Sequence, residues 1–203
     1  MNKNFNENFA HYMNREVKHY CKSYDVVIDG KLLENLFFKS FKRMGLSPIW
    51  KPESHGVGKD IEIDDALSIK TGGELKGKTP KVIRISSYRT TSHKTLPEKI
   101  KYVDEIKNYE YILCCPRRIY SDRIEYIIGY IKADIFKYED LNWSKKYHKG
   151  NFTGYKGFSD DSTITVNINK SQSDQCWETY DLKYFNPIKT ISINNDEIGC
   201  YYP

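Results

Sequence analysis

The sequence has no long hydrophobic run and no strong excess of either charge, and both absences exclude classes of protein. Its longest unbroken apolar run is Tyr111–Cys115, whereas a bilayer-spanning helix needs roughly 20 apolar residues. The opening residues are mostly polar and lack a basic-then-apolar leader, so we expect a cytoplasmic protein without a membrane segment. The formal net charge is only +5, which permits nucleic-acid binding without requiring it.

Cysteine and histidine patterns that bind metals are also missing. The five cysteines are odd in number and include no Cys-x-x-Cys pair. Cys114 and Cys115 lie inside an apolar run, as is typical of small buried residues. The histidines form no pair at helical spacing, so we expect neither a disulfide framework nor a structural zinc site.

The remaining composition is that of a folded chain. Hydrophobic residues make up 39% of it and aromatic residues 14%, too many for a disordered protein. Apolar spacing and a Thr95–Glu98 capping box predict three helices, over 5–21, 30–44 and about 95–108. Two-residue alternation predicts a hairpin at 60–70 and strands at 81–86, 111–115, 124–131 and 163–168. This order predicts an α/β or α+β domain around a mixed sheet.

The hairpin places polar residues on one face. If residues 64–66 form a three-residue loop, Asp60 lies opposite Lys70 and Glu62 lies opposite Ser68. A two-residue loop would shift this register. The other face would carry the apolar residues Ile61, Ile63, Leu67 and Ile69.

Two carboxylates and an ammonium on one face suit phosphodiester hydrolysis. Carboxylate oxygens are ligands that Mg²⁺ prefers, and the metal stabilises charge on the phosphate and helps to deprotonate a water. A lysine there orients the water and offsets negative charge. The alternative is the exposed face of an edge hairpin with ordinary ion pairs.

The segment resembles the core of the PD-(D/E)xK nuclease superfamily, in particular of type II restriction endonucleases. The resemblance rests on the helix at 30–44, Trp50-Lys-Pro, the glycine-flanked Asp60, the strand ending in Ser68-Ile-Lys70-Thr-Gly72, and Ile85-Ser-Ser-Tyr-Arg89-Thr-Thr. A helix and two strands then complete the expected order, so the resemblance covers about 30–135. It implies one nuclease domain over 1–203, with a restriction-endonuclease-like mixed sheet flanked by helices. Residues 1–29 would form an N-terminal helix, and 136–203 a C-terminal extension for DNA recognition or dimerisation.

The motif departs from the family pattern at two positions. Lys59 replaces a proline, which the superfamily tolerates, and Ser68 replaces the second acid, as in a Ser-x-Lys subgroup. Because a serine lacks a carboxylate's charge, another acid is needed. Glu62 is one candidate, unless it is an exposed strand residue. Glu34, on the apolar side of its helix, is another, unless it pairs with a lysine. Glu98 is the third candidate, although the capping box already accounts for it.

The resemblance implies an activity and a set of site residues. The activity is Mg²⁺-dependent, sequence-specific hydrolysis of double-stranded DNA by a homodimer, with Mn²⁺ able to replace Mg²⁺. A cognate DNA methyltransferase is expected as a genetic partner. The catalytic residues would be Asp60, Lys70, Ser68, Glu62 and Glu34, and the metal ligands Asp60, Glu62 and the backbone carbonyl of Ile69. Alternatives are a repair nicking enzyme, a junction resolvase, or an inactive DNA-binding module.

Two stretches rich in donors are candidates for DNA contact. Basic and hydroxyl side chains suit phosphate oxygens, and arginine can also read guanine. The alternative for each stretch is a polar surface loop. The first comprises Ser86, Ser87, Tyr88, Arg89, Thr90, Thr91, Ser92, His93 and Lys94, and the second Lys146, His148, Lys149, Tyr155 and Lys156.

Overall fold

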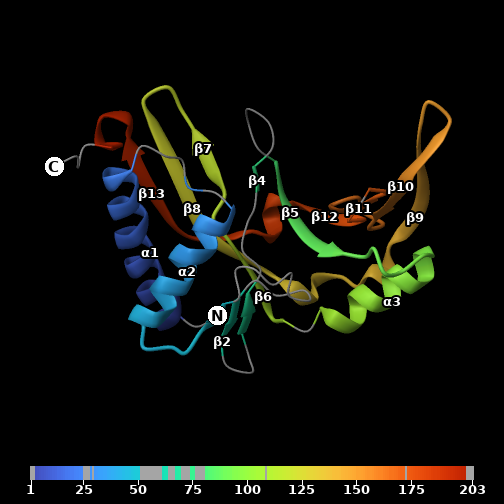
Figure 1. Cartoon of the computed structure of the whole chain (residues 1–203), viewed down its shortest axis with the longest axis horizontal. Coiled ribbons are helices and arrows are strands. Elements are labelled where there is room, and N and C mark those ends of the chain that lie inside the picture. Colours follow the sequence, from blue (N-terminus) through green and yellow to red (C-terminus); the bar gives the residue numbers. More distant parts are fainter. Residues whose placement is uncertain are drawn as a thin grey trace.

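The computed structural model shows an α+β protein whose helices and strands are arranged in Figure 1. The α-helices are α1 (Lys3–Ser23), α2 (Gly30–Arg43) and α3 (Leu96–Ile106). Short 3-10 helices are η1 (Ala133–Ile135), η2 (Tyr138–Asp140), η3 (Leu182–Tyr184) and η4 (Asn195–Glu197). The structure describes residues 3–24, 28, 30–50, 61–63, 67–69, 74–75, 81–107, 109–171 and 173–199.

The described strands form three sheets. The first joins β1 (Ile49–Trp50), β2 (Ile61–Ile63) and β3 (Leu67–Ile69). The second has the order β4 (Glu74–Leu75), β5 (Val82–Arg89), β12 (Gln175–Asp181), β11 (Ile164–Asn169), β10 (Asn151–Phe158) and β9 (Asn142–His148). The third has the order β13 (Asn186–Asn194), β8 (Arg123–Lys132) and β6 (Tyr111–Cys114), with β7 (Arg117–Ile119) also on β8.

The predicted single mixed sheet is not what the described strands form. All ladders among them are antiparallel, which is the pairing that short hairpin connections allow. In the segment 136–203 the sequence predicts one strand, at 163–168, and the structure shows that strand together with others that belong to two sheets. β12 pairs with β5 and β13 pairs with β8. The C-terminal segment is therefore built into the same sheets as the segment before it.

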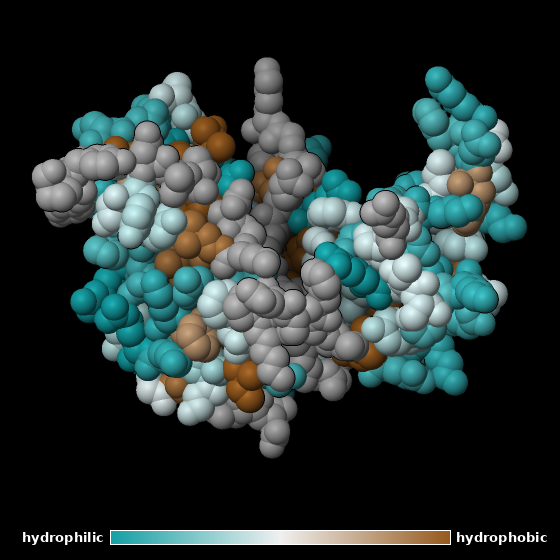
Figure 2. All heavy atoms as spheres, viewed as in Figure 1, coloured by the Kyte–Doolittle hydropathy of each residue, from teal (hydrophilic) through white to brown (hydrophobic). Residues whose placement is uncertain are grey.

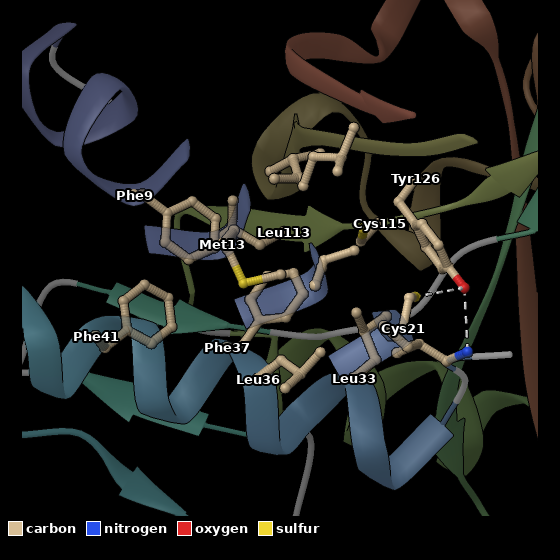
Figure 3. Packing of buried hydrophobic residues seen from close by; sticks show 14 of the residues in the cluster. Phe9, Met13, Cys21, Leu33, Leu36, Phe37, Phe41, Leu113, Cys115 and Tyr126 are labelled. Carbon is tan, nitrogen blue, oxygen red and sulfur yellow. Dashed lines mark hydrogen bonds between the residues drawn. The ribbon is translucent and has the colours of Figure 1, made fainter. Parts of the chain in front are cut away.

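The first core lies where α1 and α2 pack together against strands of the first and third sheets. Phe9 and Phe41 stack with ring centroids 4.9 Å apart, and Met13 and Phe37 fill the space beside them (Figure 3). The Tyr126 hydroxyl accepts a hydrogen bond from the backbone amide of Ile28 at 3.1 Å. The predicted helical spacings are confirmed, because the apolar side of each helix faces this core.

The second core lies between α3 and the inward face of the six-stranded sheet. Val103 of α3 is fully buried there with Ile83 and Ile85 of β5. The predicted capping box is confirmed, since the Thr95 side chain accepts from the Glu98 amide and Glu98 accepts from the Thr95 amide. The two cores meet at β6, where Leu113 enters the first core and Ile112 and Cys114 enter the second.

Candidate functional site

The β2–β3 hairpin has the register that the sequence predicts. Ile61 pairs with Ile69, Glu62 with Ser68, and Ile63 with Leu67. Ile61 and Ile63 are 0% and 1% exposed, whereas Glu62 between them is exposed. The hairpin therefore buries one face of β2 and presents Glu62 on the other. Asp60 and Lys70, the next residues along each strand, lie outside the described residues.

Glu34 is held beside this hairpin. It extends from α2, and its carboxylate Oε2 accepts a hydrogen bond from the Trp50 indole Nε1 at 3.1 Å. Trp50 belongs to β1 and pairs directly with Ile61 of β2. The helix glutamate is thus tied to the buried face of this sheet, which Trp50 shares with Ile61, whereas Glu62 lies on the opposite face. The two acids are therefore separate alternatives for the second metal ligand.

β3, the last strand of the hairpin sheet, lies beside β6 of the third sheet. β6 comes after α3 in the chain, so the hairpin is close to the strand that follows the helix. β6 is buried on both of its faces, because Ile112, Leu113 and Cys114 are all 0% exposed.

The first DNA-contact stretch divides into exposed and buried side chains. Ser86, Arg89, Thr91, Ser92 and Lys94 are exposed, and the half-exposed His93 ring stacks on Tyr102 with centroids 4.2 Å apart. Three others are buried and bonded inside the protein, so their side chains are out of reach of a DNA backbone. They are Ser87, which contacts Tyr138 and Cys176; Tyr88, which bonds to Tyr109; and Thr90, which bonds to Asp174.

A bulge explains why these side chains turn inward. The β12–β5 register shifts between the pair Trp177–Ser86 and the pair Gln175–Arg89. A bulge places an additional residue in one strand and locally breaks the alternation of faces. As a result, Ser87 and Tyr88 are both buried although they are neighbours.

A buried ion pair anchors the end of this stretch. Lys99 is 3% exposed, and its ammonium donates to Asp174 Oδ2 at 2.9 Å and to the Thr90 carbonyl at 2.7 Å. Burial acts to raise the pKa of Asp174, but hydrogen bonds from Lys99 and from the Ser171 amide outweigh it and lower that pKa. The pair therefore holds the start of β12 against the end of β5 with Asp174 ionised.

Replacing Asp174 with asparagine should remove a pH-dependent part of the stability. Because the folded pKa of Asp174 is lowered, its contribution is present above the unfolded value of about 3.9 and is lost as pH falls through the folded value. We expect Asp174→Asn to cost about 1.5–3 kcal/mol at pH 7. Urea unfolding from pH 7 to pH 3 should show the gap between the variant and the parent narrowing in acid. A gap that stays constant would contradict the assignment.

The second DNA-contact stretch forms a hairpin arm of β9 and β10. Lys149 and Gly150 both have positive φ, 49° and 79°, which is the turn that two-residue hairpins favour. His148 and Lys149 are exposed at its tip, and Lys156 is exposed and Lys146 half-buried on one face of the sheet. Tyr155 points to the other face and packs against the second core, so its predicted DNA role is not supported.

The sequence motifs do not identify the polar and aromatic residues that surround Lys146 and Lys156 on the sheet. Asn167, Asn169 and Trp177 lie on neighbouring strands with side chains on the same sheet face. They are separated from the arm in sequence and have no motif of their own. The signal available was the alternation in Thr163–Ile168, which predicts one apolar and one polar face.

The hairpin offers two oxygen ligands of the kind that a metal site needs. Among the residues that the structure describes, no group of three or more His, Cys, Asp or Glu side chains is placed to hold a metal ion. Asp60 lies outside that part of the chain. The donor types nevertheless fit Mg²⁺, because Glu62 offers an exposed carboxylate and Ile69 a backbone carbonyl, both hard oxygen ligands.

Comparisons with protein-family models, curated proteins and solved structures found no match to this chain. Among the described helices, none is both long enough and apolar enough to cross a membrane.

Proposed function

We propose that this protein is a Mg²⁺-dependent endonuclease of the type II restriction class, which cuts both strands of duplex DNA at a specific sequence. The observation that carries the proposal is the β2–β3 register, which pairs Glu62 with Ser68 while Ile61 and Ile63 are buried. Continuing that register by one pair would bring Asp60 opposite Lys70. The order of helix, hairpin, helix and following strand supports the same proposal.

Each residue of the hairpin has a distinct role in this proposal. Asp60, Glu62 and the Ile69 carbonyl would hold Mg²⁺. The metal, when bound, would stabilise charge on the scissile phosphate and favour deprotonation of a water. Lys70 would orient the attacking water and offset the negative charge of the phosphate. Ser68, opposite Glu62, is too short and uncharged to replace a carboxylate and would act as a hydrogen-bond partner.

The partners follow from the activity. Cutting a palindromic site on both strands suits a two-fold dimer, so we propose a homodimer. A cell that contains such an enzyme must protect its own DNA, so we propose that a cognate DNA methyltransferase is encoded nearby. Mn²⁺ should replace Mg²⁺, because it also accepts carboxylate and carbonyl ligands.

A cleavage assay on a mixture of plasmids, with Mg²⁺ or with EDTA, tests the proposed function. Discrete fragments that need Mg²⁺ are the expected result. Nicked circles alone, or cutting confined to branched DNA, would indicate a repair nicking enzyme or junction resolvase instead. Binding with no cleavage in Mg²⁺ or Mn²⁺ would indicate an inactive DNA-binding module.

Glu62→Gln and Glu34→Gln should differ in their effect on cleavage. Glu62 lies on the hairpin itself, so its amide variant should slow cleavage by roughly 10²-fold. Glu34 bonds to Trp50, and a glutamine can still accept that bond, so Glu34→Gln should keep most activity. Initial rates at several Mg²⁺ concentrations check this. If both variants cut like the parent, the second acid lies elsewhere, and if only Glu34→Gln is inactive, the role passes to Glu34.

A further inference from the structure

The outward face of the six-stranded sheet gathers basic and amide side chains from four strands. Strand register places Lys146 of β9 in line with Gly154 and Asn169, and Lys156 of β10 in line with Asn167 and Trp177. Arg84 of β5 lies two pairs beyond Trp177, opposite Thr179 of β12 and on the same face. We call Arg84, Lys146, Lys156, Asn167, Asn169 and Trp177 the cationic sheet face.

Two contacts hold the long basic side chains on this face. The Lys146 ammonium donates to Asn169 Oδ1 at 2.9 Å. Gly154 lies between these two residues in the register and has no side chain to block the contact. The Arg84 guanidinium stacks 4.1 Å from the centre of the Trp177 ring. Both side chains are therefore fixed over the sheet, which reduces the entropy cost of binding a ligand there.

The charges on the face are unbalanced. Burial, together with the nearby positive charges of Lys156 and Arg84, lowers the pKa of Lys146. In the described rows from Lys146 to Arg84, none of the outward side chains of β9 to β12 is acidic. Asp181, two pairs beyond Thr179, accepts a hydrogen bond from the Lys183 amide at the start of η3. At the β4 edge, Glu74 is in register with Arg84. The part of the face around Lys146 and Lys156 keeps like charges close together, and such a surface is suited to an anionic partner.

The arm extends this surface away from the body of the protein. β9 and β10 project at the upper right of Figure 1, and the same projection is mostly hydrophilic in Figure 2. Gly154 sits at the bulge of the arm with φ of 135°, and a Cβ there would lie 2.0 Å from the Ile168 carbonyl oxygen. The bend that this bulge gives the arm therefore requires glycine.

We propose that the cationic sheet face binds the phosphate backbone of duplex DNA, with Lys146, Lys156 and Arg84 contacting phosphates and Asn167 and Asn169 adding hydrogen bonds. The proposal rests on the proposed function for its choice of DNA as the partner. Basic and amide side chains are those that most often contact phosphate oxygens. Duplex is favoured over single-stranded DNA because Arg84 covers the Trp177 ring, which would otherwise be available to stack on an unpaired base.

Fluorescence anisotropy of a labelled DNA duplex of mixed sequence, measured in EDTA so that no cleavage occurs, tests the proposal. The double variant Lys146→Glu with Lys156→Glu should bind at least tenfold more weakly. For this variant, the slope of log affinity against log salt concentration should be shallower by about two, because two phosphate contacts are lost. The single variant Lys156→Glu, at an exposed site, should show about half of the change. It guards against a folding defect in the double variant.

The matched control is Lys145→Glu with Lys101→Glu, which changes the net charge equally. Lys145 is adjacent to Lys146 but has its side chain on the opposite face of β9, and Lys101 lies exposed on α3. Control binding within twofold of the parent is expected. Equal losses in the two double variants, no loss in either, or tighter binding of single-stranded than of duplex DNA by the parent would overturn the proposal.

The same variants separate this proposal from the proposed function. Cleavage of plasmids with Mg²⁺ by a sheet-face variant that also keeps full duplex affinity would overturn the sheet-face proposal and leave the nuclease proposal standing. Specific loss of duplex binding in the sheet-face variants, with no cleavage by the parent, would support the sheet-face proposal and overturn the nuclease proposal.

Discussion

Asp60→Ala and Lys70→Ala should each reduce Mg²⁺-dependent cleavage of duplex DNA by about 10³-fold or more. Removing one group that stabilises transition-state charge commonly costs about 10²–10³ in rate, and Asp60 is in addition a proposed metal ligand. Cleavage should be more sensitive to the loss of Lys70 than to the loss of an ordinary surface lysine. Lys70 is proposed both to orient the attacking water and to offset the charge of the phosphate. Single-turnover cleavage of a plasmid that carries one site measures both effects.

Two exposed residues provide matched controls for these variants. Asp140→Ala in η2 and Lys101→Ala in α3 remove the same kinds of charge away from the hairpin. Both controls should cut at the parent rate, and all four variants should keep the parent's thermal stability within a few degrees. An Asp60 or Lys70 variant that cuts nearly as fast as the parent would show that the assigned centre is wrong.

Glu178→Ala should produce the largest loss of stability, about 3–5 kcal/mol. Glu178 is 0% exposed, and its two oxygens accept hydrogen bonds from the Tyr138 hydroxyl at 2.7 Å and the Tyr180 hydroxyl at 2.5 Å. Burial, followed by the charge of Glu178, raises the pKa of both phenols well above its usual value, so both remain donors. Alanine would leave two buried donors without this acceptor and a cavity beside them.

Urea unfolding compares this variant with two others. Glu178→Gln keeps the volume and one acceptor, so it should cost roughly 1–2 kcal/mol. Glu105→Ala, at an exposed position of α3, should change stability by less than about 0.5 kcal/mol. For a chain of this length, Glu178→Ala should lower the melting temperature by roughly 6–20 °C. An effect no larger than that of Glu105→Ala would refute the role given to this network.

The parts of the fold that the sequence predicted well depend on neighbouring residues. The hairpin register follows from the alternation of Ile61 and Ile63 and the length of the loop, both local features. The capping box needs only Thr95 and Glu98. The helices follow from apolar spacing that the first core confirms.

The parts that the sequence did not reveal depend on residues far apart in the chain. β12 was missed because Glu178 occupies an inward position, where only its bonds to Tyr138 and Tyr180 make a carboxylate acceptable. The bulge that turns Ser87 inward has no local signature. The cationic sheet face likewise forms only when β5, β9, β10, β11 and β12 align, so Asn167 and Asn169 could not be recognised beforehand.

The position of β6 between the two cores couples their unfolding. Since Leu113 packs into one core while Ile112 and Cys114 pack into the other, removing β6 from either core disrupts both. β8 reinforces the coupling, with Ile128 in the first core and Ile131 in the second. The proposed catalytic hairpin and the cationic sheet face therefore belong to one cooperative unit, and damage to the packing of either half lowers the stability of both.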